Sequence, residues 1–507
     1  MSKAKTKKPA VKKPVVNKPT GTNPLLVEIL AAPDDPGPRM VYADALIEAG
    51  DPRGMFIAQQ AELDALDVLD DRYAAILAST RRLIGAHGKA WIGEYAKRTK
   101  LVAGPHGAYD VDRLLNARFE DGFLRRIAMR PDDIEREWPT LRAREPIRGI
   151  ELLVDEHIRP EHRAMPQARD FEVLKVTPSS WFTAASVGNV LAWGMPRLRT
   201  LDLSGCDLGA APELLANGET DLGRTFDDFV TPPPFPHGQL RELVLENTQL
   251  RDAGALAIFG AAHLENLTTL DLTRCRIADP ETLDALRAAP AMQRLVRLAL
   301  GGNNLLGEHL GRLAGWEVVA RLEALFLPQS TTPGALATLF PRPSPTLRTL
   351  ELASAKELGP APGLVDVAEA LVHLDIGTTA MGDERFAAVV VAPAMRRLLS
   401  LAANGCSLSD AAIDELVSSP LERLVTLDLS SNKLTDAGLR TLAGWSGLEH
   451  VTHLRIGNNR KVTSAGLASL LDAAHLHPAA LDIGKQSDGK IVARLRERFG
   501  DALLVRG

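Results

Sequence analysis

Three cysteines and one cluster of acidic residues and histidines are the side chains of this 507-residue chain with the clearest potential for chemistry. Cys206, Cys275 and Cys406 are potential thiolate nucleophiles or metal ligands. The densest ionisable cluster is Asp155-Glu156-His157 followed by Glu161-His162, residue types that bind metal ions. Its spacing matches no metal-ligand motif, so we expect no metal and no cofactor.

The motifs of the common catalytic and nucleotide-binding sites are missing from the sequence. There is no G-x-x-x-x-G-K-[ST], no H-E-x-x-H, no G-x-S-x-G and no C-x-x-C. We therefore predict a protein that is not an enzyme, without catalytic residues and without a small-molecule substrate.

A leucine pattern recurs in place of such motifs. Eleven times between Leu198 and Ile483 the chain repeats a form of L-x-x-L-x-L-x-x-(N/C/T/S)-x-L. The copies begin at Leu198, Leu240, Leu267, Leu295, Leu322, Leu347, Leu371, Leu398, Leu424, Val451 and Pro478. After a first interval of 42 residues, successive copies begin 24 to 28 residues apart. A period of this length predicts a solenoid.

The copy that begins at Leu424 shows what one repeat should form. Leu427-Asp428-Leu429 alternates with the period of a strand, whereas Leu439 and Leu442 have helical spacing and follow a Thr435-Asp436 cap. Strands pack about 4.8 Å apart and helices about 8 to 10 Å apart, so the stack must curve with its strands inside. Ten strand steps give a concave sheet about 50 Å long, enough to hold a protein domain.

The cysteines provide an independent check on the register of the repeats. All three occupy the ninth place of their copies, where a small polar side chain satisfies backbone groups inside the turn. Other copies carry there Thr248, Asn303, Ser330, Thr379, Asn432 and Asn459. We therefore expect structural thiols, and no disulfide, because Cys206 and Cys275 should lie two layers apart.

The residue between the two strand leucines, the fifth place, should point to the concave surface. In chain order these residues are Asp202, Val244, Asp271, Ala299, Phe326, Glu351, Asp375, Ala402, Asp428, Arg455 and Asp482. Six of the eleven are acidic and one is basic, which favours a basic partner over an acidic one. The candidate partner-binding residues are Asp202, Glu242, Asp271, Phe326, Glu351, Asp375, Asp428 and Arg455. The alternative is a solvated sheet whose carboxylates only keep the protein in solution.

The repeat wording resembles a known family. The period near 27 and the sequence L-x-x-L-D-L-S-x-N from Leu424 to Asn432 resemble leucine-rich repeats of the ribonuclease-inhibitor type. The resemblance covers about residues 198 to 483. It implies an α/β leucine-rich repeat solenoid with a parallel concave sheet and convex helices, preceded here by a small α-helical domain.

A second resemblance lies upstream of the repeats. Residues 23–63 are similar to the repeat-companion domain that precedes leucine-rich repeats in certain bacterial proteins. The matching pieces are Pro33-Asp34-Asp35, Arg39, Val41-Tyr42-Ala43-Asp44, Gly50-Asp51-Pro52-Arg53 and Phe56-Ile57, with Gly122-Phe123 and Arg125-Arg126 further on. This resemblance implies architecture and no defined activity.

Charge is unevenly distributed along the chain. Residues 1–22 contain seven lysines and no acid, so with a net charge of −5 the remainder carries −12. Such a Lys/Pro tail is typical of disordered segments, and it is the one place where nucleic acid or an acidic surface would bind. No apolar run approaches the length of a membrane span, and the start lacks a signal sequence. We expect a cytoplasmic protein without membrane contact.

The predicted organisation has five parts. They are a tail at 1–22, a helical domain at 23–100, irregular capping coils at 101–190, the solenoid at 191–490 with an insertion near 212–239, and a C-terminal cap at 491–507. The insertion contains the proline run Thr231-Pro232-Pro233-Pro234-Phe235-Pro236, either a rigid loop or a docking segment.

These observations predict a non-catalytic scaffold that binds a protein partner on the concave face. The alternative is a regulator of a small GTPase, because activators of the GTPase Ran share this type of repeat. That alternative depends on fold analogy alone, and neither Arg251 nor Arg274 can be assigned a role in it.

Overall fold

The computed structural model describes residues 23–93, 95, 117–154, 164–178, 184–209, 239–329, 331–353, 364, 366–379, 381–486 and 488–506. The Lys/Pro tail, the proline-rich insertion and the acidic cluster at 155–162 lie outside these residues.

The described strands form one continuous sheet, and their order in the sheet is their order in the chain. β1 pairs with β2 in antiparallel fashion, and every later neighbour is parallel. The strands are β1 (Ala117–Glu120), β2 (Phe123–Met129), β3 (Gly149–Leu153), β4 (Val173–Thr177), β5 (Thr200–Asp202), β6 (Glu242–Val244), β7 (Thr269–Asp271), β8 (Arg297–Ala299), β9 (Ala324–Phe326), β10 (Thr349–Glu351), β11 (His373–Asp375), β12 (Ser400–Ala402), β13 (Thr426–Asp428), β14 (His453–Arg455), β15 (Ala480–Lys485) and β16 (Leu503–Arg506).

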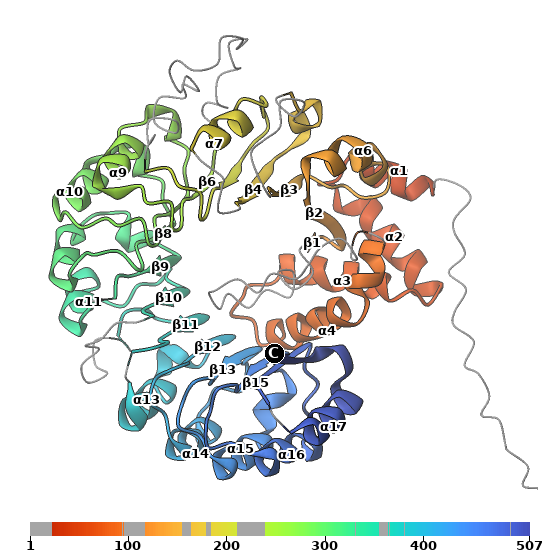
Figure 1. The fold of residues 1–507 in the computed structure, drawn as a ribbon, viewed down its shortest axis with the longest axis vertical. Helices are drawn as coiled ribbons and strands as arrows, with labels where there is room; N and C mark the ends of the chain where they lie inside the picture. Colours follow the sequence, from red (N-terminus) through yellow and green to blue (C-terminus); the bar gives the residue numbers. More distant parts are fainter. Residues whose placement is uncertain are drawn as a thin grey trace, which may run out of the picture.

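Helices line the outside of the curved sheet, and the strands line the inside (Figure 1). The helices are α1 (Pro24–Ala31), α2 (Pro36–Glu48), α3 (Pro52–Ala65), α4 (Tyr73–Ile92), α6 (Pro131–Arg142), α7 (Ala184–Leu191), α9 (Arg251–Phe259), α10 (Glu281–Ala288), α11 (Pro333–Leu339), α13 (Gly382–Val390), α14 (Asp410–Ser418), α15 (Asp436–Ala443), α16 (Ser464–Asp472) and α17 (Gly489–Phe499). The predicted leucine-rich repeat solenoid, with a helical region before it, is confirmed.

Each repeat folds as its sequence indicates. In the copy that begins at Leu424, the strand leucines Leu427 and Leu429 are fully buried. Thr435 caps α15, because its hydroxyl oxygen accepts a hydrogen bond from the Ala437 amide at 3.2 Å. Leu439 and Leu442 point back into the same layer.

Polar side chains at the ninth place hold the turns together from inside the core. The buried Asn432 amide donates to the carbonyls of Ala403 and Leu429, at 2.8 and 3.1 Å, and its oxygen accepts from the Leu408 amide at 3.1 Å. Asn303 and Asn459 repeat this pattern, and the Cys275 and Cys406 thiols donate to carbonyls of the preceding layer. Ser330, the predicted ninth-place residue of the copy that begins at Leu322, lies outside the described residues; the next residue, Thr331, donates to the Pro328 carbonyl.

Before the repeats, three helices begin with the same N-terminal capping motif. Asn23, Asp35 and Asp51 each accept a hydrogen bond from the amide two residues further on, and each precedes a proline in the first turn. Proline suits this place because its missing N–H has no helical partner. These short motifs therefore set the starts of α1, α2 and α3.

This helical bundle is attached to the first strands by residues of the second sequence resemblance. Arg53 donates to both oxygens of Glu145, at 2.9 and 2.7 Å, and its guanidinium lies 5.1 Å from the centre of the Phe123 ring. Arg39 pairs with Asp121 at 2.6 Å. Gly122 has a φ of +83°, and a Cβ there would collide with Ile57, so the turn requires glycine.

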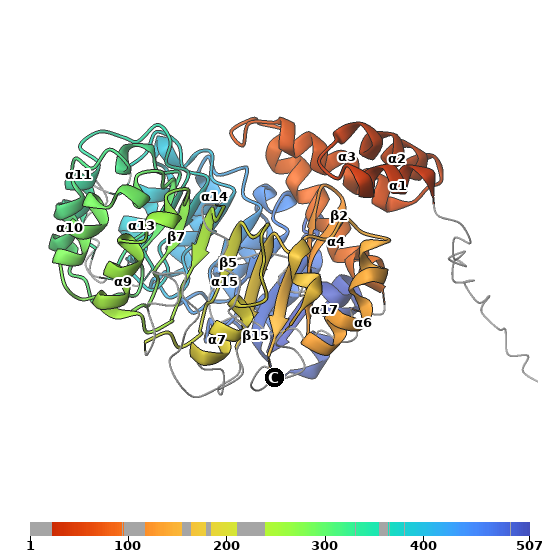
Figure 2. The same ribbon diagram turned by 90° about the horizontal axis from the view of Figure 1, so that it is seen from above.

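The remaining feature of the fold is α4, which leaves the bundle and lies against the C-terminal repeats. Figure 1 shows it beside β13 and β15, so that helix and sheet together close the arc, and Figure 2 shows α1 to α3 on one side of the arc. The concave face, which we predicted to bind a partner along its length, is therefore covered by the chain's own α4 at its C-terminal end.

Replacing Asn432 by alanine tests the polar ladder. The change leaves two carbonyls and one amide in the core without their side-chain partner, so the free energy of unfolding should fall by about 3 kcal/mol. Urea denaturation followed by circular dichroism measures it. Lys433→Ala, an exposed neighbour, is the matched control and should change stability by less than about 0.5 kcal/mol. Equal midpoints for the two variants would contradict the ladder's role.

Candidate partner-binding surface

The fifth-place residues form one row along the concave sheet, because the strands pair in register. Phe326 on β9 is the partner of Glu351 on β10, and Glu351 is the partner of Asp375 on β11. Asp202 and Val244 are paired in the same way at the other end of the row. The structure thus brings the predicted candidates into one line.

Most aspartates of this row also have a structural role. A side-chain oxygen of each accepts a hydrogen bond from the backbone amide two residues further on. The pairs are Asp202 with Ser204 at 3.0 Å, Asp271 with Thr273 at 2.8 Å, Asp375 with Gly377 at 2.7 Å, Asp428 with Ser430 at 2.8 Å and Asp482 with Gly484 at 2.8 Å. Aspartate at this place therefore closes the turn after the strand, and its presence alone does not indicate a binding site.

Charge compensation separates the ends of the row from its middle. Arg455 lies 3.6 Å from a carboxylate oxygen of Asp428 and 3.5 Å from one of Asp482. At the other end, Lys175 lies between Glu151 and Asp202, at 3.7 and 4.0 Å. Both ends of the row therefore contain their own cations.

In the middle, three carboxylates face the concave side without such compensation. We call Asp271, Glu351 and Asp375 the acidic row; no ion pair joins them to a cation within the described residues. Burial raises the pKa of Glu351 to about 7, with repulsion from Asp375 and Asp271 as the next causes. Burial likewise raises the pKa of Asp271 and of Asp375 to about 6. An incoming cation would relieve this repulsion.

Phe326 is the apolar neighbour of the acidic row. It is partly exposed on β9, directly beside Glu351. An aromatic ring next to a carboxylate suits a guanidinium or ammonium group, which interacts with both.

Asp428 does not belong to the exposed surface, contrary to our prediction. Its side chain is 3% exposed and its charge is met by Arg455. The reason is that the C-terminal part of the sheet is covered, as the burial of its neighbours shows.

The extent of this cover is seen in the burial of the second residue of each repeat, which stands just before the strand. In the first six repeats this residue is exposed or half-buried; in the next four it is buried. The first set is Arg199, Arg241, Thr268, Val296, Glu323 and Arg348, and the second is Val372, Leu399, Val425 and Thr452. Val372, Leu399 and Val425 form an apolar cluster with Ala74 and Ala78 of α4.

Sequence reasoning missed this cover although a signal was present. The second place changes from mostly charged or polar residues to Val372, Leu399 and Val425. Aliphatic residues at the same place of three successive repeats would be unfavourable in water, so this change indicates that another element packs on them.

The cysteines have no reactive environment. All three are free and fully buried. Burial raises the pKa of the Cys206 thiol to about 12 and that of Cys275 to about 11, and it also raises the pKa of Cys406. Within the described ranges no three His, Cys, Asp or Glu side chains gather as metal ligands.

The two arginines considered for GTPase activation occupy ordinary surface positions. Arg251 begins α9, and Arg274 lies 3.9 Å from Glu246. Neither geometry favours a catalytic role.

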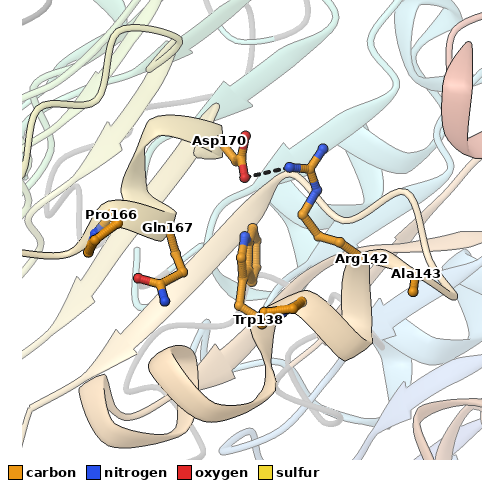
Figure 3. Close-up of a pocket in the computed structure, with 7 residues that line it drawn as sticks. Trp138, Arg142, Ala143, Pro166, Gln167 and Asp170 are labelled. Atoms are coloured by element: carbon orange, nitrogen blue, oxygen red, sulfur yellow. Dashed lines mark ion pairs between the residues drawn. The ribbon is translucent and has the colours of Figure 1, made fainter.

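A shallow groove lies between α6 and the short helix η3 (Pro166–Asp170). Figure 3 shows Trp138 at its base and the ion pair between Arg142 and Asp170 at its rim. The Trp138 indole nitrogen and the Gln167 side-chain oxygen have no hydrogen-bond partner among the residues that the structure describes, but both atoms are buried. The groove is therefore no candidate site.

The pH dependence of stability tests the state of Glu351. Its pKa in the folded protein is raised from 4.5 to about 7, so its contribution to stability is present below pH 4.5 and is lost as the pH rises through 7. Between pH 5 and pH 8, Glu351→Gln should gain up to about 3 kcal/mol in unfolding free energy relative to the wild type.

Urea denaturation at each pH measures this gain. Glu323→Gln changes an exposed residue just before β9, the neighbouring strand. The unfolding free energy of this variant should follow that of the wild type at every pH. A Glu351→Gln curve that is also parallel would show that the carboxyl is not perturbed.

Comparisons with known proteins agree with the repeat assignment. A family model described as Leucine Rich repeat matches residues 263–280 and 424–443, and a second, described as Leucine Rich Repeat, matches residues 197–217. The chain therefore contains leucine-rich repeats. A search of curated proteins finds no match.

The search of solved structures returns matches of low sequence identity and low TM-score. An internalin (inlF) from Listeria monocytogenes is 18% identical, with 67% of this chain and 82% of that chain covered and a TM-score of 0.35. The yeast Rad7 and Elc1 complex is 13% identical, with 83% of this chain and 92% of that chain covered and a TM-score of 0.37. The TLR13–ssRNA13 complex is 20% identical, with 67% of this chain and 43% of that chain covered and a TM-score of 0.35. In the part of the chain that the structure describes, every helix is too short or too polar to cross a bilayer.

Proposed function

We propose that this protein is a non-catalytic, cytoplasmic scaffold that binds a basic segment of a protein partner on the acidic row. The observation that carries the proposal is the contrast along the concave sheet: carboxylates at both ends form ion pairs with Arg455 and Lys175, whereas no ion pair within the described residues joins Asp271, Glu351 or Asp375 to a cation. Repeat solenoids commonly bind partners on such concave surfaces.

The chemistry of the acidic row favours a lysine or arginine side chain of the partner. Burial, and for Glu351 also repulsion from Asp375 and Asp271, raises the pKa values of these carboxylates and outweighs the opposing charge of Arg274 on Glu351. A partner cation lowers those pKa values and displaces protons, so binding should weaken between pH 7 and pH 5. Phe326 supplies apolar contact beside the ion pairs.

The proposed surface keeps most of the predicted residues. Asp202, Glu242 and Arg455 flank the row at its two ends, and Asp428 is left out because it is buried. We also propose a finer family assignment: the repeats are of the ribonuclease-inhibitor type and of bacterial origin, and residues 23–100 form a repeat-companion domain. Two features support this assignment: the three helices that begin with a proline after a capping Asn or Asp, and the ion pair between Arg53 and Glu145.

The test removes the charge of the acidic row and keeps its shape. Asp271→Asn, Glu351→Gln and Asp375→Asn together should reduce capture of partner proteins from native lysate at least tenfold, as measured by quantitative mass spectrometry. The same variant should lose its affinity for an arginine-rich model peptide, measured by calorimetry at pH 7.5.

The matched control removes three carboxylates from the convex side. Glu384→Gln, Asp414→Asn and Glu415→Gln change exposed residues on α13 and α14 by the same total charge. Proteins captured by the wild type and the control, but not by the acidic-row variant, are the expected partners. Identical sets for both variants would refute binding on this surface.

A further inference from the structure

Two arginines of the late repeats hold the segment of the chain that precedes α4. Arg397 forms an ion pair with Asp71, and Arg423 donates to the carbonyl oxygens of Val68 and Leu69, at 3.1 and 3.4 Å. Both arginines have the same place in successive copies, the residue just before the first leucine, which we call the preceding place. We call Arg397 and Arg423 the occupied pair.

A second pair of arginines stands at the preceding place of two earlier successive copies. Arg294 precedes Leu295, and Arg321 precedes Leu322. We call these two arginines the open pair. Both are exposed, and within the described residues no ion pair joins either of them to a carboxylate. The strands of their copies, β8 and β9, lie across the arc from the helical bundle (Figure 1).

The local sequence gives the first arginine of each pair the same setting. Residues 289–295 read Ala-Pro-Ala-Met-Gln-Arg-Leu and residues 392–398 read Ala-Pro-Ala-Met-Arg-Arg-Leu, so the two segments differ at one position. Both segments contain a short 3₁₀ helix, and in both the methionine is fully buried. Arg294 and Arg397 therefore leave the same kind of turn from equivalent positions.

The two pairs also flank one continuous row of backbone. From Val296 to Val425, the amide of each second-place residue accepts its partner from the copy before, because it donates to the carbonyl oxygen of the preceding second-place residue at 2.7 or 2.8 Å. Only the copy that begins at Leu347 separates the open pair from the apolar cluster that packs on α4. The open pair thus continues a surface that already binds a helix and the turn before it.

Charge replaces apolar contact around the open pair. The occupied pair is accompanied at the second place by Leu399 and Val425, which belong to the apolar cluster with α4. Near the open pair, the exposed Arg297 begins β8, and the half-buried Arg348 has the second place of the next copy. A segment that binds here should therefore present carboxylates where α4 presents alanines.

A turn of polypeptide fits this surface better than a nucleic acid. The exposed Glu323 has the second place in the same copy as Arg321, and it would repel a continuous line of phosphates. The occupied pair binds a carboxylate together with main-chain carbonyl oxygens, a combination that polypeptide supplies. Arg294 donates to the side-chain oxygen of Asn266 at 2.7 Å, and a carboxylate would be a stronger acceptor than this neutral amide.

We propose that Arg294 and Arg321 bind an acidic turn of a partner protein, in the way that Arg397 and Arg423 bind the chain's own turn at residues 68–71. Arg348 adds a further cation for its carboxylates. This surface is separate from the acidic row, and its role does not depend on the proposed function.

Fluorescence anisotropy of the full chain with a labelled peptide tests the proposal. The probe has the sequence of residues 66–80, whose acidic turn contains Asp67, Asp70 and Asp71. The chain's own copy of this segment competes for the occupied pair at a high effective concentration, because it is covalently attached. The free peptide should therefore bind at the open pair.

Arg294→Gln with Arg321→Gln should weaken peptide binding at least about tenfold, because the charge-assisted hydrogen bonds of both arginines are lost. A peptide that carries Ala74→Glu and Ala78→Glu should bind the wild type more tightly than the first probe, since it offers carboxylates to the surrounding arginines. A peptide with its three aspartates changed to asparagine should bind more weakly.

The matched control removes two exposed arginines from outer helices. Arg440→Gln on α15 with Arg494→Gln on α17 should leave peptide binding unchanged. The variant that neutralises the acidic row should also bind the peptide at least as well as the wild type, which separates this surface from the proposed function.

A charge swap distinguishes direct contact from a structural role. Arg294→Glu with Arg321→Glu should lose the acidic peptide and should bind a peptide with three lysines in place of its aspartates more tightly than the wild type does. Damage to the fold would not produce this gain, and circular dichroism of every variant should match the wild type.

Three results would overturn the proposal. They are absence of saturable binding to the wild type up to about 1 mM peptide, binding that persists in the Arg294→Gln, Arg321→Gln variant, and tighter binding of a single-stranded oligonucleotide of the same net charge through the same two arginines. The last would make the surface a nucleic-acid site.

Discussion

The open face of each leucine layer is the constraint on which this structure depends. One repeat of about 27 residues cannot bury its own leucines, so every layer must be covered by the next, and the last layers must be covered by something else. At the C-terminal end β16 and α17 provide the cover, and at the N-terminal end the β1–β2 hairpin and the helical bundle do so. The helix α4 extends that principle sideways, because it covers strand starts instead of layer ends.

The parts of the fold that obey a local rule were predictable from sequence. Leucine spacing predicted the repeats, and the Thr435-Asp436 cap predicted where α15 begins. The packing of α4 on the late repeats was not predictable in this way, because Arg81 and Thr426 are 345 positions apart and no periodic pattern links them. The apolar second place of the late repeats indicated a cover without identifying it.

The candidate surface was predictable in its position but not in its energetics. Counting acidic residues at the fifth place treats Asp271 and Asp428 as equivalent. The structure separates them, since Arg455 and the cover neutralise and bury one, while the other remains on the concave side. One residue type thus serves both the turn after the strand and the electrostatics of the surface, and spacing alone cannot separate these two roles.

The long sequence separation between α4 and the repeat residues that it contacts has a consequence for biosynthesis. Arg82 contacts His477, 395 positions further along the chain. At about 5 to 20 residues per second, a ribosome needs roughly 20 to 80 seconds to make the intervening segment. During that time the small apolar face of α4 has no partner within its own nascent chain, which makes it a natural substrate for chaperones.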